Sequence, residues 1–542
     1  MSFVISILLV SSSYLTGQAT SRLVEQTNAG KKKAVEIVTS FDGLGDGFEG
    51  PQGSSEYRNP SDNSLAVGPD HIMQTVNSRM AIFTKKGNKF TKSGEVLYGP
   101  VPTNNVFRGF GGPCEKFNNG DAVVRYDQLE NRWLVVMPIF RRLPPHKNQP
   151  EQVNHSQQAM ESVPWSISQP GEAVPLYQPP VQVQKNHPGF AGNREERVSN
   201  DEPGTYCMCY AISEGPDPFG PYYRYAFVRP LFPDYPRPAI WIDGYYNSSS
   251  SGDHVIQKHA CVVEREKMLK GLPAKEICFI VEGSNFLNNA DIDGFQLPDN
   301  GDPNIMMATG GAQLNNVFAD DGIYTWKFYT NWENPSDSKL EGPEKIEVEP
   351  YSYLGNGQLT KTIPQPGVEQ KLDAQGDKIM SRLVYRRIDK QESIVGVHSI
   401  NTSSGNGGVR WYEFRLDDEK EVKLYQQGTF APDKLYRWMA SPAMDKFGNI
   451  GIGYSYGGET VFPGQRFAAR QAFDPKGILT HREAILINGE ASQSKTMRWM
   501  DYTTTALDPA DDHTIWYVGD YLKKGSEHYS TKIGAFRIPN IK

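Results

Sequence analysis

Residues 498–517, with the sequence RWMDYTTTALDPADDHTIWY, decide how the fold is interpreted. The first half alternates polar and apolar residues up to an Asp-Pro turn, and the second half continues with β-branched and aromatic residues. This pattern predicts two antiparallel strands joined by a tight loop. Copies of the same unit elsewhere in the chain would therefore indicate a repeated all-β fold.

Weaker copies of this unit begin with a polar residue, here called an opener, at Asp62, Asp121, Arg382, Ser441 and Asp501. Each opener precedes an alternating run, an Asp-containing turn and a second strand-like run. Several successive openers are about 60 residues apart, a period that suits a four-stranded β-propeller blade better than a helical repeat.

The long interval between Asp121 and Arg382 leaves room for further blades, with candidates at residues 235–249 and near residues 321–332. We therefore predict an all-β fold, a β-propeller of six or seven four-stranded blades. A propeller closes well when one blade takes strands from both chain ends, because this hides two sheet edges. Residues 34–38 (AVEIV) and 535–538 (AFRI) are the expected closing pair.

The ends of the chain and one internal segment have a different composition. Residues 1–19 contain the apolar run FVISILLV and small residues near Ala19, which predicts a signal peptide, although a single hydrophobic strand is the alternative. A polar segment follows at 20–34, and a single propeller domain is expected over 35–542. Residues 141–203 are rich in Pro and Gln and are expected to form a loop insertion, either a tolerated insertion or a lid.

The composition excludes several classes of protein. A formal charge of -7 on 542 residues, without long runs of like charge, argues against nucleic-acid binding. After the leader, no run approaches the ~20 apolar residues of a membrane-spanning helix. The expected location is secreted, periplasmic or at the cell surface.

The five cysteines are too few for a disulfide framework. Cys261 and Cys278 lie in two segments that could be neighbouring strands, so they are the preferred disulfide. Cys207 and Cys209 would point to one face of a strand, and Cys114 could pair with either of them. One thiol must stay unpaired.

Candidate functional residues follow from the repeat. The innermost strands of a propeller run in the same direction, so the openers should gather at one mouth of the central channel. The expected catalytic residues are Asp501, Asp121 and Tyr502, with a carboxylate for acid/base chemistry or a tyrosine nucleophile. The expected substrate-binding residues are Arg382, Arg437, Arg498, Trp438, Trp499 and Asp62.

These residue types suit a glycan. Guanidinium groups bind carboxylate or sulfate in a bidentate manner, and tryptophan rings stack on sugar rings. The same residues also have a structural interpretation, in which Arg bridges loop carbonyls, Trp fills the wedge between blades and Asp satisfies backbone N–H groups. Both interpretations stay open at the level of sequence.

No cofactor or metal site is expected. The histidines form no HExxH motif or close pair, so a catalytic zinc has no support. Asp291 and Asp293 suggest a calcium loop, but no Glu follows at the twelfth position, and a simple turn is expected instead.

Several segments, among them DNSLAVGPDHIMQTVNSRMAIF, DYPRPAIWIDGYY and YRWMASPAMDKFGNIGIGYS, resemble a family of secreted bacterial proteins that is similar to the sialidase-like propellers. The resemblance covers most of the chain and implies a sialidase-like propeller and export. True sialidases carry S-x-D-x-G-x-T-W turns, which SPAMDKFGNI and DPADDHTIW only approximate, so the resemblance does not imply the sialidase reaction itself.

The functional hypothesis is an exported propeller that binds or cleaves glycans, such as anionic saccharides, through an Arg/Asp/Trp-lined channel mouth. If it is an enzyme, a glycoside hydrolase-like activity is expected. The alternative is a non-catalytic platform that binds a carbohydrate or another extracellular polymer or protein.

Overall fold

The structure is a computed structural model that describes residues 24–55, 58–143, 160–162, 166–167, 174–175, 205–229, 232–251, 257–314, 317–357 and 360–539. The expected signal peptide at residues 1–19 and most of the Pro/Gln-rich segment lie outside these residues.

The first four sets of strands follow one another along the chain, and within each set the neighbours are hydrogen-bonded in chain order. The first set contains β5 (Ser64–Val67), β6 (His71–Val76), β7 (Arg79–Thr84) and β8 (Val96–Pro102). The second set contains β9 (Val123–Asp127), β10 (Arg132–Leu143), β14 (Thr205–Ser213) and β15 (Pro221–Arg229). The third set contains β16 (Pro233–Ile240), β17 (Gly244–Ser251), β18 (Gln257–Glu264) and β19 (Glu276–Val281). The fourth set contains β20 (Asn285–Asp293), β21 (Asn304–Thr309), β22 (Ile323–Tyr329) and β23 (Lys339–Ile346).

Three further sets complete the arrangement. The fifth set contains β26 (Leu383–Ile388), β27 (Gln391–Asn401), β28 (Gly407–Leu416) and β29 (Val422–Phe430). The sixth set contains β30 (Tyr436–Met444), β31 (Ile450–Gly458), β32 (Val461–Arg470) and β33 (Ala484–Ile487). The seventh set contains β34 (Thr505–Leu507), β35 (Ile515–Tyr521), β36 (Ser530–Arg537) and the N-terminal β2 (Glu36–Asp42). Because β2 pairs with β36, the predicted closing pair of strands is confirmed.

Short elements lie around these sets. Strand β1 (Glu25–Gln26) pairs with β29, so the polar N-terminal segment is attached to the fifth set. From the Pro/Gln-rich segment, β11 (Met160–Ser162) pairs with β19, while β12 (Ser166–Ile167) and β13 (Val174–Pro175) pair with β15. The remaining elements are β3 (Glu49–Gly50), β4 (Gly53–Ser54), β24 (Ile363–Gln365), β25 (Val368–Leu372), η2 (Thr103–Phe107), α2 (Gly112–Lys116), α3 (Arg265–Leu269), η3 (Pro335–Asp337) and η4 (Leu354–Asn356).

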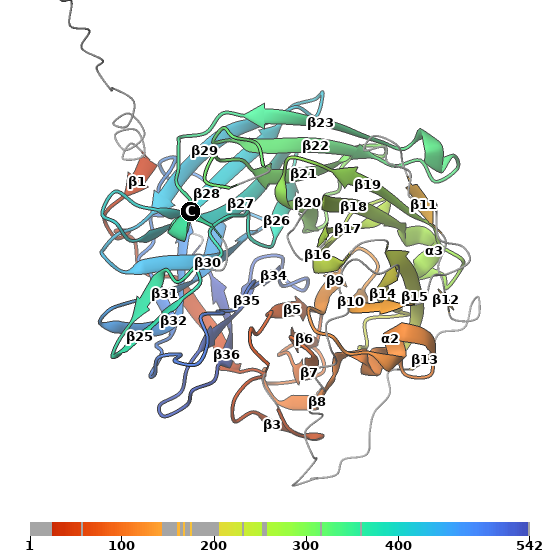
Figure 1. Cartoon of the computed structure of the whole chain (residues 1–542), viewed down its shortest axis with the longest axis horizontal. Coiled ribbons are helices and arrows are strands. Elements are labelled where there is room, and N and C mark those ends of the chain that lie inside the picture. The colour runs from red at the N-terminus through yellow and green to blue at the C-terminus, as the bar shows by residue number, and fades with distance from the viewer. Residues whose placement is uncertain are drawn as a thin grey trace, which may run out of the picture.

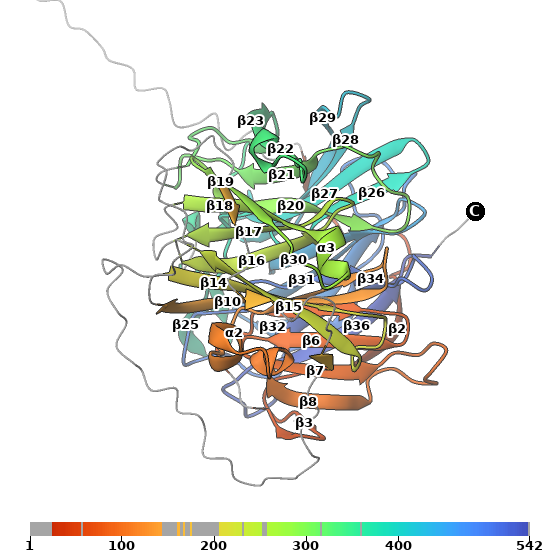
Figure 2. The ribbon, with the colours of Figure 1, turned by 90° about the vertical axis from the view of Figure 1, so that its right-hand side faces the viewer.

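The sets are arranged in a ring, with their first strands towards the centre (Figure 1). Strand β5 contacts β9, and contacts continue in chain order through β16, β20, β26, β30 and β34, which contacts β5 again. The fourth and fifth sets are also joined by parallel pairing of β20 with β26. Figure 2 shows the sheets from the side. The fold is therefore all-β and β-propeller-like.

The blade candidate near residues 321–332 contains β22, which is the third strand of the fourth set. One sequence prediction about this ring was wrong. Asp291 and Asp293 were expected in a turn, but both lie in β20. The alternation of an amphipathic strand is the same in every position of a blade, so it did not distinguish a first strand from a third one.

Aspartates explain the recurrent turns that follow the first strands. Asp127 accepts a hydrogen bond from the backbone N–H of Leu129, and Asp508 accepts one from Ala510. Asp445 likewise receives the N–H groups of Phe447 and Asn449, at 2.9 and 3.0 Å. A carboxylate that bonds to the backbone two residues later holds the chain in a turn.

Large apolar side chains fill the spaces between neighbouring sets. In the cluster between the sixth and seventh sets, the rings of Phe467 and Phe536 have centroids 4.0 Å apart. Gly453 of β31 faces the ring of Tyr517, and a Cβ at this position would lie 2.5 Å from that ring. The absence of a side chain therefore allows the two sheets to approach closely.

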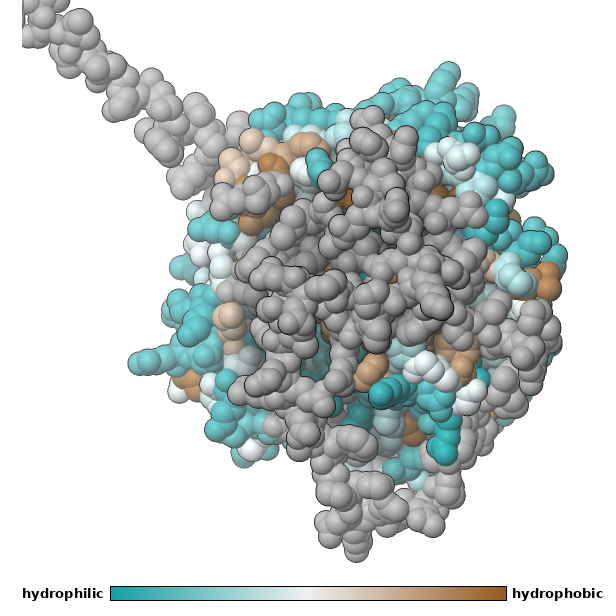
Figure 3. All heavy atoms as spheres, turned by 45° about the vertical axis from the view of Figure 1, so that its right-hand side comes forward, coloured by the Kyte–Doolittle hydropathy of each residue, from teal (hydrophilic) through white to brown (hydrophobic). Residues whose placement is uncertain are grey.

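The face shown in Figure 3 is mostly hydrophilic where its residues are described, with separate hydrophobic patches. Among the described residues, no helix is both long and apolar enough to span a bilayer.

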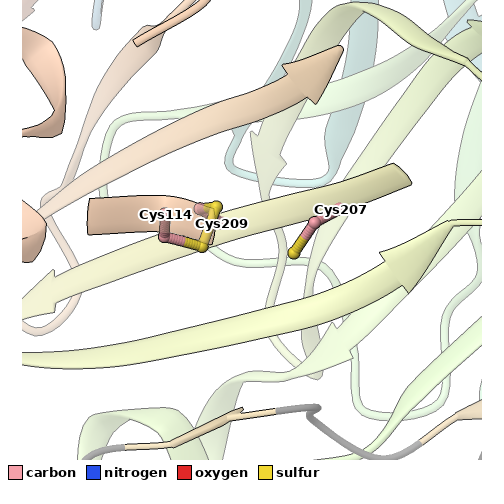
Figure 4. A group of neighbouring side chains, drawn as sticks. All are labelled: Cys114, Cys207 and Cys209. Atoms are coloured by element: carbon pink, nitrogen blue, oxygen red, sulfur yellow. A yellow bond between two sulfur atoms is a disulfide. The ribbon is translucent and has the colours of Figure 1, made fainter. Parts of the chain in front are cut away.

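The structure contains the expected disulfide Cys261–Cys278 and a second one, Cys114–Cys209. The second disulfide ties α2 to β14, and the buried free Cys207 lies on the same strand (Figure 4). Helix α2 lies shortly before Asp121 in the chain. The disulfide therefore helps to fix the position of the segment that carries this candidate site residue.

Candidate functional site

Four aspartates lie at the beginning of first strands, or just before them, and therefore at one end of the ring. Asp62 precedes β5, Asp121 precedes β9, Asp234 is the second residue of β16, and Asp501 precedes β34. Asp62, Asp121 and Asp501 have φ angles of 49°, 55° and 63°. Aspartate adopts this left-handed region more readily than most residues, which suits it to the backbone conformation required just before these strands.

Asp62, Asp121 and Asp234 form what we call the carboxyl cluster. The carboxyl of Asp121 is hydrogen-bonded to both Asp62 and Asp234. Burial raises the pKa of Asp62, and the neighbouring charge of Asp121 raises it further. Burial and the charge of Asp234 raise the pKa of Asp121 to about 8. Like charges in a desolvated site cannot all ionise, so the cluster retains a proton at neutral pH.

Asn77 and Arg498 provide hydrogen-bonding and positive charge beside the cluster. The side-chain amide of Asn77 donates to Asp62 Oδ2 at 2.5 Å. The charge of Arg498 acts on both Asp62 and Asp121. The guanidinium of Arg498, whose side chain is 37% exposed, is bound through Nε to Asp501 Oδ1 at 3.0 Å. Asp501 also accepts a hydrogen bond from Gln375 at 3.1 Å.

Two tyrosines form a stacked pair at the same place. The rings of Tyr235 and Tyr502 are 4.4 Å apart and nearly parallel. The hydroxyl of Tyr502 has no hydrogen-bond partner among the described residues, and the side chain is only 3% exposed. Burial, followed by the charges of Asp62 and Asp121, raises the pKa of Tyr502 well above its usual value. A phenol held neutral in this way is a poor nucleophile, so its surroundings favour Tyr502 as a neutral hydrogen-bonding group, and the nucleophilic role stays a prediction.

Arg382 lies deeper in the channel than the carboxyl cluster, in a separate group of charges. Its Nε and Nη2 atoms bind Asp291 and Asp293, each at 2.6 Å. These three residues and Arg125 line a cavity of about 40 Å³ that continues to Gly294 and Pro509, beyond the ends of the first strands. The guanidinium is therefore committed to two buried carboxylates, and the expected clamp on a substrate acid at the mouth is wrong for Arg382.

Arg437 and Trp438 are also buried. The Arg437 side chain is 0% exposed, and its guanidinium binds Asp433 and Glu483 at 2.8 and 2.9 Å. Trp438 is 0% exposed, and Trp499 is buried with its indole N–H donating to Ser455 at 3.0 Å. Neither tryptophan presents a free face for stacking on a sugar, so these expected binding roles are corrected. Both rings belong to the apolar core cluster instead.

Of the expected site residues, the structure brings together Asp62, Asp121, Arg498, Asp501 and Tyr502. Sequence analysis did not identify Asp234 and Tyr235 as site residues, although the blade candidate at residues 235–249 begins with Tyr235. Strand β16 has a register irregularity between Asp234 and Arg237, which interrupts the alternation on which the prediction relied. The Asp-Tyr pair immediately before Pro236 resembles Asp501-Tyr502, and this similarity was the available signal.

Three groups of described residues have the ligand atoms and proximity that a metal ion needs: Cys114, Cys207 and Cys209; Cys261, Glu276 and Cys278; Asp299, Asp302 and Glu392. The first two groups contain disulfides. In the third group, Lys420 binds Asp302 and Glu392, and Arg387 binds Asp299, so each carboxylate already has a cationic partner. None of the groups includes a member of the carboxyl cluster.

Comparisons with known proteins give a limited result. Neither models of protein families nor curated proteins match this chain. Among solved structures, the chain is similar to a protein of unknown function from Dyadobacter fermentans, with a TM-score of 0.37 and 10% identity over 93% of this chain and 100% of that chain. It is also similar to an ulvan lyase of polysaccharide lyase family 25, with a TM-score of 0.37 and 11% identity over 95% of each chain.

A third similar structure is a GH43 β-1,3-galactosidase, with a TM-score of 0.26 and 10% identity over 92% of this chain and 94% of that chain. TM-scores and identities this low carry no argument about the activity of this chain. The resemblance to sialidase-like propellers stays a prediction.

Proposed function

We propose that the protein is a seven-bladed β-propeller that acts on glycans by acid/base chemistry at one mouth of its central channel. The seven strand sets and the closed series of contacts between their first strands support the blade count. The two disulfides support an oxidising location, such as the periplasm, the cell surface or the exterior.

The observation that carries the catalytic proposal is the carboxyl cluster beside Arg498, whose guanidinium binds Asp501. Asp121 is kept protonated by burial and by its neighbours, so it is suited to donate a proton to a leaving oxygen. Asp501 is bound by Arg498 and Gln375, so it is suited to act as the base. Two carboxyls whose surroundings separate their pKa values are the usual arrangement for acid/base work.

Direct contact between Asp62 and Asp121 has a mechanistic consequence. Retaining and inverting glycosidases hold their two catalytic carboxyls about 5 to 9.5 Å apart, whereas these two are hydrogen-bonded. Asp62 and Asp121 therefore act as one unit that shares a proton. In this proposal Asp62 adjusts the pKa of the acid, Asp121, and Asp501 supplies the second carboxylate.

The test is a screen of the mature protein against polysaccharides and chromogenic glycosides, with detection of both reducing ends and unsaturated products. Asp121→Asn should lower kcat by about 100-fold or more, because it removes the proton donor. Asp243→Asn is the matched control: burial raises the pKa of Asp243 to about 6, but this residue follows β16 at the opposite end of the strand. Equal activity of the two variants would refute the catalytic proposal.

A second function, a non-catalytic binding platform, is favoured by one observation. Arg382 and Arg437 are buried in ion pairs and Trp438 and Trp499 are buried in the core, so much of the expected rim is structural. If the protein binds a glycan and no product forms under any condition, the platform is the better description.

A further inference from the structure

We infer that the mouth of the channel takes a glycan with free amino groups, such as an oligomer of unacetylated glucosamine, with the ammonium against the carboxyl cluster. This inference rests on the proposed function and names its substrate class. It replaces the anionic saccharide expected from the sequence, since the arginine clamp that favoured an acid is not formed.

The charges at the mouth are the first step. Asp62, Asp121 and Asp234 face Arg498, which already binds the carboxylate of Asp501. Arg237 also lies near Asp234, but its Nε donates to the carbonyl of Leu287 at 2.6 Å. Four acidic groups thus share two guanidinium groups. Positive charge is therefore in short supply at the mouth, and the cluster retains a proton when it is empty. A ligand that brings positive charge supplies it, whereas a uronate would add one more acidic group.

The other cations of the channel are committed elsewhere. Lys378 binds Asp377 at 3.1 Å and also donates to Gln375. Arg382 binds Asp291 and Asp293, deeper in the channel. Within the described residues, neither cation is placed to neutralise the carboxyl cluster, so the shortage of positive charge is a property of the mouth itself.

Tyr502 is an independent indication of a ligand. Its buried hydroxyl lacks a hydrogen-bond partner in the described part of the chain, although it lies close enough to Asp62 and Asp121 for their charges to act on it. Buried polar groups are almost always hydrogen-bonded, so an unpaired hydroxyl calls for a donor or acceptor that comes from outside. An ammonium has three N–H donors, which could be shared by this oxygen and two carboxylates.

The stacked pair of Tyr235 and Tyr502 already holds one cation. The guanidinium of Arg237 lies over the ring of Tyr235 at 4.7 Å. Both rings are buried, so the pair offers a ligand the hydroxyl of Tyr502 and no free ring face.

Proton release gives the inference a specific signature. The carboxyl cluster retains a proton when it is empty, and a bound ammonium favours full ionisation. The displaced proton passes to the buffer, while the ligand stays protonated and no bond of the ligand is broken. The binding enthalpy should therefore depend on the ionisation enthalpy of the buffer.

The experiment is calorimetric titration of the mature protein with glucosamine oligomers, N-acetylglucosamine oligomers of the same length and galacturonate oligomers, each in two buffers. The amino oligomers should bind at least about tenfold more tightly than the other two probes and should release protons. Asp234→Asn should reduce this preference, and Arg498→Gln, at a partly exposed position, should increase it. Asp243→Asn should leave it unchanged.

The outcomes separate the two proposals. Equal or tighter binding of the acetylated or acidic oligomers, with turnover intact, would overturn the amino-sugar inference and leave the proposed function standing. The same holds if calcium binds the carboxyl cluster and is required for any oligomer to bind. If no glycan binds or is converted under any of these conditions, both proposals fail.

Discussion

Replacement of Asp121 by asparagine is expected to stabilise the protein increasingly as the pH rises from about 5 to about 8, relative to the unchanged chain. The folded-state pKa of Asp121 is raised from 3.8 to about 8, first by burial and then by the charge of Asp234. A carboxyl with a raised pKa contributes stability below its unfolded pKa and loses that contribution as pH rises through its folded pKa. Asparagine does not titrate, so the variant avoids this loss.

The magnitude follows from the size of the shift. Each pH unit between the two pKa values corresponds to about 1.4 kcal/mol, so three pH units give an upper bound of about 4 kcal/mol. Asp121 is hydrogen-bonded to Asp62 and Asp234 and is only partly buried by area, so both factors reduce the effect. We expect a gain of about 2 kcal/mol for the variant over this range.

The assay is urea unfolding followed by tryptophan fluorescence, at about pH 5, 6, 7 and 8. The control is Asp243→Asn, because the pKa of Asp243 is raised only to about 6 and its difference from the unchanged protein should stop growing near that pH. A constant difference between Asp121→Asn and the unchanged protein across all four pH values would show that Asp121 is ionised throughout, and would refute the reasoning about the carboxyl cluster.

Two further predictions concern stability. Replacing Cys114 and Cys209 by serine should cost about 4 to 5 kcal/mol, and replacing Cys261 and Cys278 about 3 kcal/mol. The first disulfide joins cysteines 95 residues apart and the second joins cysteines 17 residues apart, so the first restricts the unfolded chain more. Thermal unfolding should therefore show the larger loss of stability for the first variant. Arg382→Met should cost about 3 to 5 kcal/mol, since it removes the ion-pair partner of the buried Asp293 and leaves Asp291 with Arg125 at 3.4 Å. The cost should shrink at acidic pH, and a variant as stable as the unchanged protein at neutral pH would contradict this.

Much of the ring could be predicted from the sequence because its signals are local. The alternation of strands and the period of the openers depend on residues close together in the chain, and these identified the starts of β5, β9 and β26. The closing pair of β2 and β36 was also predictable, since an unpaired strand at each end of a ring leaves two open edges.

The site was only partly predictable because a residue's place at the mouth does not determine its exposure. Arg437 and Arg498 both precede Trp in a similar local sequence, but Arg437 meets Asp433 and Glu483 in the interior, whereas Arg498 stays partly exposed beside Asp501. The partner Glu483 lies 46 residues from Arg437, and no local pattern reveals such a contact. The raised pKa of Asp121 likewise depends on Asp234, which comes from another strand set.

The seventh strand set has a consequence for how the chain is made. During synthesis β2 leaves the ribosome well before β36, its only described neighbour in the sheet. The circle can therefore shut only after all the intervening strand sets have been made. Proteolytic removal of β36 would leave β2 without this neighbour, although the two strands are far apart in the sequence.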